Sequence, residues 1–295
     1  FGDFDSPIVK DYIPPPSSLS ALMYGDNRGI QGHNNSCYLD CTLFSMFCCS
    51  SNFDEMLQPE NFSNADENLK EIQGCLSSGI VNCLRSHGFV RADRVARFRQ
   101  ILEATGQIKG VLDQEKDPEE FINFLMNLLW PKKPLLELKL ISTNNSYDGN
   151  ILQILGVRDP RETMPTLQNL YEKSMIFSDI KFAKVSLMPY RPQTNDCNNN
   201  HRIQLNLFAV ICISISHYVA FVRCGNKVDS NWCFYDSMFD RDITGYNIPR
   251  VERLDDVATW LSDHRYACEG YLNENVPDRL RRLFEDAYIC MYSSD

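Results

Sequence analysis

The chain has 295 residues, of which 43% are hydrophobic and 23% are charged, so it can fold around a large buried core. It carries 29 lysines and arginines against 39 aspartates and glutamates, and this net charge of −10 argues against nucleic acid as a partner, because phosphates attract a basic face. No run of roughly 18 apolar residues is present, so no membrane span is predicted.

The twelve cysteines lie mostly in apolar runs and form no C-x-x-C pair. Zinc ribbons and fingers need paired cysteines or histidines at short spacing, so the sequence predicts no metal site. Disulfide scaffolds are typical of small secreted domains, and nothing here resembles a secretory signal. We therefore expect reduced thiols in a cytoplasmic protein, most of them packed as small hydrophobic side chains. Because position 1 is Phe rather than Met, we interpret the chain as a fragment of a longer protein.

Residues 1–28 contain three consecutive prolines followed by serines, which predicts an entry arm rather than a packed element. A polar turn rich in Gly and Asn then runs into an apolar stretch whose spacing, from Leu39 to Phe47, is helical. Cys37 is therefore expected at or within the first turn of a helix.

The pattern stays helical from 66 to 130. Asp117 and Pro118 suit the N-cap and the first position of one further helix. The expected core positions are Leu69, Ile72, Ile80, Leu84, Val95 and Phe98, with Phe121, Phe124, Leu125 and Leu128 on the last helix.

After Pro131 the pattern changes to that of a sheet. We predict strands at 135–141, 151–157, 205–214, 218–223, 232–236 and 287–292, a short helix at 166–174, and a polar loop at 189–202. A helical front half and a sheet-rich back half indicate an α+β fold with a cleft between its lobes.

Cys37 is a candidate nucleophile. A thiol attacks a carbonyl group as its thiolate, which the positive end of a helix and a neighbouring imidazole both favour. Backbone N–H groups at the same helix end can hold an oxyanion. Position alone leaves open the alternative that Cys37 is one more buried cysteine.

His217 is the candidate base, because among five histidines it alone stands at a strand end inside an apolar run. Asp236 ends another predicted strand, and two neighbouring antiparallel strands would let its carboxylate orient the imidazole. A structural histidine and a turn aspartate are the alternative. His33 is a rival base close to Cys37, whereas His87, His201 and His264 resemble surface or loop residues.

Four segments carry a family resemblance. Residues 29–40 (GIQGHNNSCYLD) and 216–221 (SHYVAF) resemble the cysteine and histidine boxes of the ubiquitin-specific proteases. Residues 116–121 (KDPEEF) fall where that family carries its Gln-Gln-Asp segment, and 287–292 (AYICMY) resemble its closing strand. Further matches at 115–121, 207–210 and 234–242 point to one branch of the family, which lacks the zinc fingers subdomain.

The resemblance implies a papain-like ubiquitin-specific protease fold, with a helical thumb at about 29–130 and a β-sheet palm at about 131–295. It implies hydrolysis of isopeptide or peptide bonds at the ubiquitin C-terminus, with preference for lysine-63-linked and linear chains on signalling proteins. Cys37 is then the nucleophile, His217 the general base and Asp236 the orienting carboxylate. No cofactor is implied for these residues.

Two departures from the family pattern stand out. Most members place an oxyanion-binding Asn five residues before the nucleophile, and here that residue is Gly32. Backbone N–H groups, or the side chains of Asn34 or Asn35, are left as oxyanion donors. The branch is also expected to carry a zinc-binding B-box insertion and two strands near 184–185, and both are absent from this sequence.

The ubiquitin tail is basic and apolar before its two terminal glycines, so Asp117, Glu120 and Tyr288 are candidate contacts for it. Alternatively, Asp117 only caps a helix, Glu120 only faces solvent, and Tyr288 only fills the core. Two rival functions also remain open: a catalytically inactive ubiquitin-binding module of the same fold, and another papain-like peptidase or acyltransferase.

Overall fold

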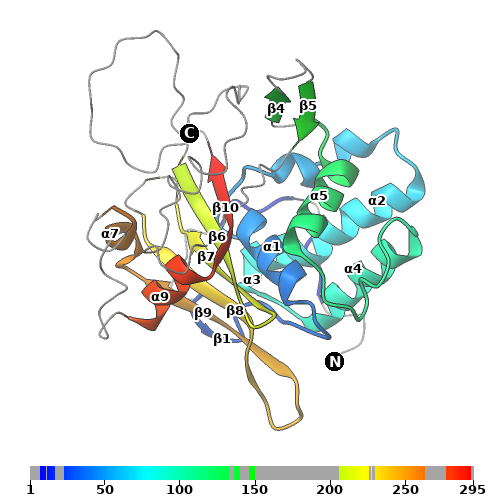
Figure 1. Cartoon of the computed structure of the whole chain (residues 1–295). Coiled ribbons are helices and arrows are strands. Elements are labelled where there is room, and N and C mark those ends of the chain that lie inside the picture. The colour runs from blue at the N-terminus through cyan, green and yellow to red at the C-terminus, as the bar shows by residue number, and fades with distance from the viewer. Residues whose placement is uncertain are drawn as a thin grey trace, which may run out of the picture.

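The protein is described by a computed structural model (Figure 1). It places residues 7–10, 12–16, 23–132, 136–139, 146–149, 206–225, 227, 230–262 and 277–293, with only the backbone given at 136–139 and 146–149. The strand predicted at 151–157, the helix at 166–174, the loop at 189–202 and the insertion point near 184–185 lie outside the described residues.

A six-stranded antiparallel sheet forms the centre of the molecule, with strand order β1-β9-β8-β7-β6-β10. Its strands are β1 (Gly25–Asp26), β6 (Asn206–Ser214), β7 (His217–Arg223), β8 (Trp232–Arg241), β9 (Asn247–Leu254) and β10 (Ala287–Ser293). Two smaller pairs are β2 (Gly29–Ile30) with β3 (Phe89–Val90), and β4 (Leu136–Lys139) with β5 (Ser146–Gly149). The mixed architecture confirms the α+β fold class.

Strand β9 was not predicted, and β8 extends five residues beyond its predicted end. Charged residues and Pro249 interrupt β9, and proline within a run normally argues against a central strand. In the fold, β9 pairs with β8 on one side and with only the two-residue β1 on the other, where the carbonyl of Pro249 accepts a hydrogen bond from the Asn27 N–H. A strand next to the edge of the sheet tolerates a proline and charged residues that an inner strand would not.

The helices fall into two groups on opposite sides of the sheet (Figure 1). One group comprises α1 (Cys37–Phe47), α2 (Glu67–Gly74), a π-helical turn (Cys75–Val81), α3 (Asn82–His87), α4 (Ala92–Ala104) and α5 (Pro118–Leu129). Two 3₁₀ turns, Asp54–Leu57 and Pro59–Phe62, belong to the same side. The other group is α7 (Val257–Ser262) and α9 (Asp278–Glu285), neither of which was predicted. No described helix is long and apolar enough to cross a bilayer.

Both faces of the sheet are buried, and the alternation along β7 shows how. Tyr218, Ala220 and Val222 point into the main core shared with the larger helical group. Val219 and Phe221 point into a second core, under Trp260 of α7 and Leu280 of α9. Because both faces of β7 are covered, its sequence is an unbroken apolar run rather than an alternating one.

Helix α1 occupies the middle of the main core, and every one of its residues is buried. It packs on strands β6, β7 and β8 on one side and on α5 on the other. The ring of Phe44 stacks on Tyr235 of β8 at 4.0 Å, and Tyr38 meets Phe121 of α5 edge to face. The chain therefore starts its most buried helix at Cys37.

The N-terminal arm is more firmly packed than its proline-rich sequence predicted. The Asn82 amide donates to the carbonyls of Val9 and Tyr12, and the buried Arg85 donates to that of Pro14. Gly25 and Asp26 add strand β1 to the edge of the sheet. An arm without a strand partner leaves backbone carbonyls free as acceptors, and these two buried polar side chains use three of them to hold it.

Candidate active site

Cys37 is the first residue of α1, as predicted, and its side chain is 4% exposed. The carbonyl of Ser36 accepts hydrogen bonds from the N–H groups of Leu39 and Asp40. Within the described contacts, the N–H groups of Cys37 and Tyr38 have no such acceptor. The Cys37 thiol therefore lies at the positive end of α1, beside backbone N–H groups that have no backbone acceptor among the described contacts.

His217 is the first residue of β7 and follows a two-residue hairpin turn. Ile215 and Ser216 form that turn with φ angles of 47° and 61°, and Ser214 pairs with His217 across it. Two successive left-handed residues match the twist of a tight antiparallel hairpin. The turn fixes the register, and therefore the place, of the imidazole.

Asp236 lies 2.8 Å from the imidazole, measured from Oδ1 to Nε2 of His217. The same carboxylate oxygen accepts the Met238 N–H at 2.9 Å. The register of β8 against β9 shifts between Asp236 and Asp240, and such a bulge re-aims the side chains beside it. A backbone donor and a bulge therefore hold the carboxylate toward the histidine.

The thiol, imidazole and carboxylate form one chain of hydrogen bonds. Hydrogen bonds to Asp236 and to Cys37 raise the pKa of His217 to about 9, against the opposing effect of burial. Since Nε2 faces Asp236, Nδ1 is the nitrogen left to face the sulfur. The ring is then protonated at neutral pH, and an adjacent imidazolium favours the thiolate.

The rival base, His33, has a different environment. Burial and the positive charge of Arg99 lower the pKa of its imidazole. Its backbone N–H donates to the Ser36 hydroxyl at 2.8 Å. His87 is exposed, as expected, whereas His201 and His264 lie outside the described residues. Among the described histidines, the geometry favours His217.

Arg99 was not singled out from the sequence, yet it holds the loop before Cys37. Only 1% of this residue is exposed. Its guanidinium donates to the carbonyls of His33 at 2.7 Å and Asn34 at 2.8 Å, and also to that of Val111. A lone arginine in a helical pattern resembles any surface residue, so periodicity gave no signal. Its burial makes it an anchor for the loop.

Gly32 occupies the position of the family's oxyanion asparagine, and the fold leaves no room for a side chain there. A Cβ atom would lie 2.7 Å from Cγ of Met238 and 2.9 Å from the Ser237 hydroxyl. The Gly32 N–H donates to the Ser237 carbonyl, and its own carbonyl accepts from the Asn247 amide at 2.8 Å. The side chains of Ser237 and Met238 thus fill the space that an asparagine at position 32 would need.

Asn34 and Asn35 are both exposed and both have left-handed backbones, with φ of 43° and 57°. The Asn35 amide donates to the Asp113 carbonyl at 2.9 Å, so it is directed toward that loop rather than toward Cys37. No described contact brings the Asn34 side chain to the thiol. The described contacts bring neither side chain to the thiol, and the oxyanion donor stays a prediction, with the backbone N–H of Cys37 as a further candidate.

Asp40 is a second residue that the sequence did not single out. Its fully buried carboxylate accepts the Ser36 hydroxyl at 2.6 Å, one turn below Cys37. Burial raises its pKa to about 7, while the hydroxyl and the charge of Arg99 act in the opposite direction. Asp40 therefore supports the turn that leads into Cys37.

Asp117, the N-cap of α5, and Tyr288 of β10 are in contact. The Tyr288 hydroxyl hydrogen-bonds to Asp117, whose other oxygen caps α5 through the Glu119 N–H at 2.7 Å. The ring of Tyr288 also lies 6.4 Å from that of Tyr218, centroid to centroid. Tyr288 is 42% exposed, so core packing does not explain it.

Glu120 points to solvent and pairs with Lys116 at 3.4 Å. Burial raises the pKa of Tyr218 to about 12, with the charges of Asp117 and Cys37 among the smaller causes. Tyr218 is therefore close enough to Asp117 and to Cys37 for their charges to act on it, while Glu120 stands on the exposed face of α5.

Comparison with curated proteins finds ubiquitin carboxyl-terminal hydrolase CYLD from mouse and from human, each 31% identical, and from cattle, 30% identical. Each alignment covers the whole chain, but only 41%, 40% and 41%, respectively, of the relative. The aligned region is 389 residues long, so these relatives carry residues within it that the 295-residue chain lacks. No protein-family model matches the chain.

Proposed function

The chain belongs to the ubiquitin-specific protease family as a relative of CYLD, and on this premise we propose that it is a cysteine-type deubiquitinase. The observation that carries the proposal is the hydrogen-bonded series from Asp236 through His217 to Cys37. The substrate is ubiquitin joined through its C-terminus to a lysine or to another ubiquitin.

In the first half of the reaction, the Cys37 thiolate attacks the carbonyl carbon at the ubiquitin C-terminus. The oxyanion that forms is held by the backbone N–H of Cys37 at the positive end of α1. Imidazolium at His217 gives its proton to the leaving amine, the carbon–nitrogen bond breaks, and a thioester to ubiquitin remains.

In the second half, His217 is neutral and accepts a proton from water, which attacks the thioester carbonyl. The carbon–sulfur bond breaks, the new carboxyl group of ubiquitin loses its remaining proton to solvent, and the Cys37 thiolate and the imidazolium are restored. Asp236 fixes the orientation of the ring in both halves of the reaction.

The substrate tail is proposed to lie between α5 and the ends of β7 and β10. Asp117 offers a negative charge to the basic tail, and Tyr218 and Tyr288 offer aromatic surface beside it. Preference for lysine-63-linked and linear chains, a signalling role and a cytoplasmic location are parts of the proposal that rest on the sequence resemblance. The free state of all ten described cysteines fits a reducing compartment.

The test is a panel of ubiquitin dimers of every linkage, with mass detection of any adduct formed by ubiquitin that carries a C-terminal electrophile. We expect cleavage by the wild-type chain, fastest for lysine-63-linked and linear dimers, and a single adduct on Cys37. Cys37→Ala should lose both cleavage and adduct while still binding ubiquitin.

An inactive ubiquitin-binding module would bind ubiquitin but form no adduct. A general papain-like peptidase would cut a short peptide with the ubiquitin tail sequence as well as it cuts a ubiquitin dimer. Cleavage that survives Cys37→Ala would remove the proposed mechanism altogether.

A further inference from the structure

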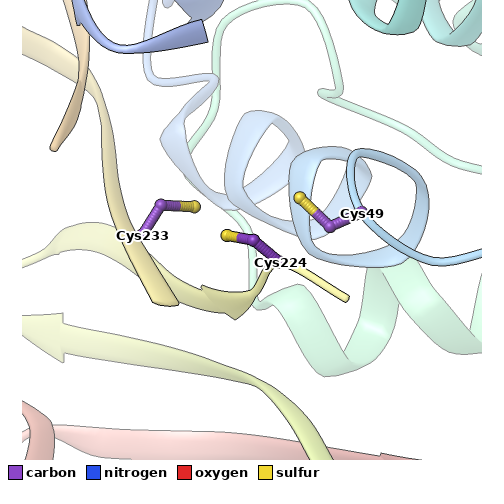
Figure 2. A group of neighbouring side chains, drawn as sticks. All are labelled: Cys49, Cys224 and Cys233. Atoms are coloured by element: carbon purple, nitrogen blue, oxygen red, sulfur yellow. The ribbon is translucent and has the colours of Figure 1, made fainter. Parts of the chain in front are cut away.

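Three thiols from distant parts of the sequence meet at the end of α1 remote from Cys37 (Figure 2). Cys49 follows the C-terminus of α1, Cys224 follows β7, and Cys233 lies near the start of β8. The three sulfur atoms are all within 4.8 Å of one another. Figure 2 shows the sulfurs of all three residues turned toward a common point.

A fourth thiol adjoins this thiol cluster. Cys48 hydrogen-bonds to Cys49 through its sulfur and is fully buried. Buried Arg85 brings a guanidinium to the same end of α1, where it donates to the carbonyls of Phe47 and Ser50, each at 2.8 Å.

The backbone around the cluster is held rigidly. Val222 pairs with Cys233 across β7 and β8, and the Cys224 N–H donates to the Asn231 carbonyl at 2.7 Å. Cys233 and Cys49 are buried, while Cys224 is partly exposed and gives access from solvent. Three thiols from three separate elements, one of them reachable from solvent, form a set of soft ligands already gathered at one place.

The spacing of the sulfurs suits a thiophilic ion. Zinc–sulfur bonds of about 2.3 Å place the sulfurs of a tetrahedral site about 3.8 Å apart, so small side-chain rotations would close the cluster around one ion. Soft thiolates favour zinc or copper(I) over magnesium and calcium. With three thiolates, a zinc site keeps one negative charge, and the guanidinium of Arg85 at this end of α1 is itself paired with Asp54 at 2.6 Å.

We propose that Cys49, Cys224 and Cys233 bind one zinc ion, with Cys48 as the nearest fourth thiol. Each ligating thiol that is still protonated loses its proton to solvent when the ion binds, and no oxidant or reductant is needed. The proposal is independent of the deubiquitinase activity.

The position of the cluster suggests a structural role for the ion. α1, β7 and β8 also carry Cys37, His217 and Asp236, so an ion here would tie together the three elements that hold the candidate catalytic groups. The eleven-residue α1 alone separates the two ends by roughly 17 Å, at 1.5 Å per residue, which is too far for the ion to touch substrate.

The test measures zinc bound by the full chain after reduction, incubation with zinc sulfate and removal of free metal. We expect one zinc per chain in the wild type, and loss of that zinc in Cys224→Ala and in Cys233→Ala. Cys290→Ala is the matched control, because this partly buried cysteine of β10 lies outside the cluster and should leave the zinc content unchanged.

A second measurement does not depend on how well the variants fold. Cobalt(II) added to the metal-free, reduced wild type should give thiolate-to-cobalt charge-transfer absorption, which zinc then displaces. No charge-transfer band, or equal zinc in the wild type and both cluster variants, would overturn the proposal. An intact mass lower by two hydrogens in reduced, metal-exposed protein would also overturn it, since it would reveal a disulfide instead.

Discussion

The two ends of α1 place cysteine in opposite surroundings. At its start, the Cys37 thiol meets an imidazole backed by a carboxylate. Just past its end, Cys49 meets other thiols and the strands that carry them. The same three elements build both places, so the chemistry of each thiol is set by its neighbours rather than by the cysteine or by the scaffold.

The largest difference between the two ends should appear on removing one thiol from each. Cys37→Ala should lower turnover of a ubiquitin dimer by about 10⁴-fold or more, because the nucleophile is lost. Cys233→Ala should leave the turnover of the folded fraction within about threefold and instead lower stability by about 1–2 kcal/mol. Single-turnover assays and thermal unfolding are measured for both variants. Near-normal turnover by Cys37→Ala would contradict the assignment of Cys37 as the nucleophile.

Asp236→Asn tests whether the carboxylate controls the histidine. The neutral amide cannot stabilise the imidazolium, so we expect kcat to fall by about 10² to 10⁴ with little change in KM. Asp240→Asn, on the exposed part of the same strand, is the control and should stay within about twofold. A loss confined to KM would show that Asp236 acts on binding instead.

The pH profile gives a second measure of the same interaction. The folded pKa of His217 is raised from 6.5 to about 9, so imidazolium persists at neutral pH and is lost as the pH rises through 9. Activity should therefore decline above about pH 9, and Asp236→Asn should shift this decline to lower pH. The stability that this raised pKa contributes is complete below pH 6.5 and disappears over the same rise. An unshifted alkaline limb in the variant would contradict the assignment.

Arg99→Met should weaken the end that holds Cys37. It removes charged hydrogen bonds from three backbone carbonyls, and we expect about 2–4 kcal/mol less stability and a lower kcat. Arg97→Met, on the same helix but exposed and paired with Glu71, should cost less than about 1 kcal/mol. Urea unfolding monitors both variants, and equal losses would deny Arg99 its anchoring role.

Asp117→Asn separates charge from helix capping, because asparagine caps a helix as well as aspartate. We expect about a tenfold higher KM for ubiquitin substrates, with kcat and stability nearly unchanged. The difference from the wild type should shrink at high salt, since screening weakens attraction to a basic tail. A KM that does not change would leave Asp117 with only its structural role.

The smallest expected effect lies in the turn before His217. Ile215 is 98% exposed and has a left-handed backbone, which is strained for a β-branched residue. Ile215→Asn relieves this strain without losing burial, and should raise stability by about 1 kcal/mol, or roughly 2–3 °C in Tm. Differential scanning calorimetry measures the shift, and a lower Tm would show that Ile215 makes a stabilising contact.

Several parts of the fold could be predicted because they depend on neighbouring residues alone. Asp117 and Pro118 begin α5 as expected, since capping requires only the local N–H groups. The apolar runs at β6 and β7 identified two central strands, since residues buried on both faces leave no polar alternation. By contrast, β9 and α9 were missed because their polar composition is explained only by where they lie in the sheet and on its outer face. Helix α7 was missed because six residues are too few to show a helical period.

The sequence by itself determined that Cys37 begins a helix, that His217 stands at a strand end, and that the chain resembles the ubiquitin-specific proteases. Only the tertiary structure decided that Arg99 is buried, that a side chain at Gly32 has no room, and that Cys49, Cys224 and Cys233 meet. Local propensity acts within a few residues, whereas these facts depend on contacts between segments up to about two hundred residues apart, which hydrophobic packing and strand register bring together.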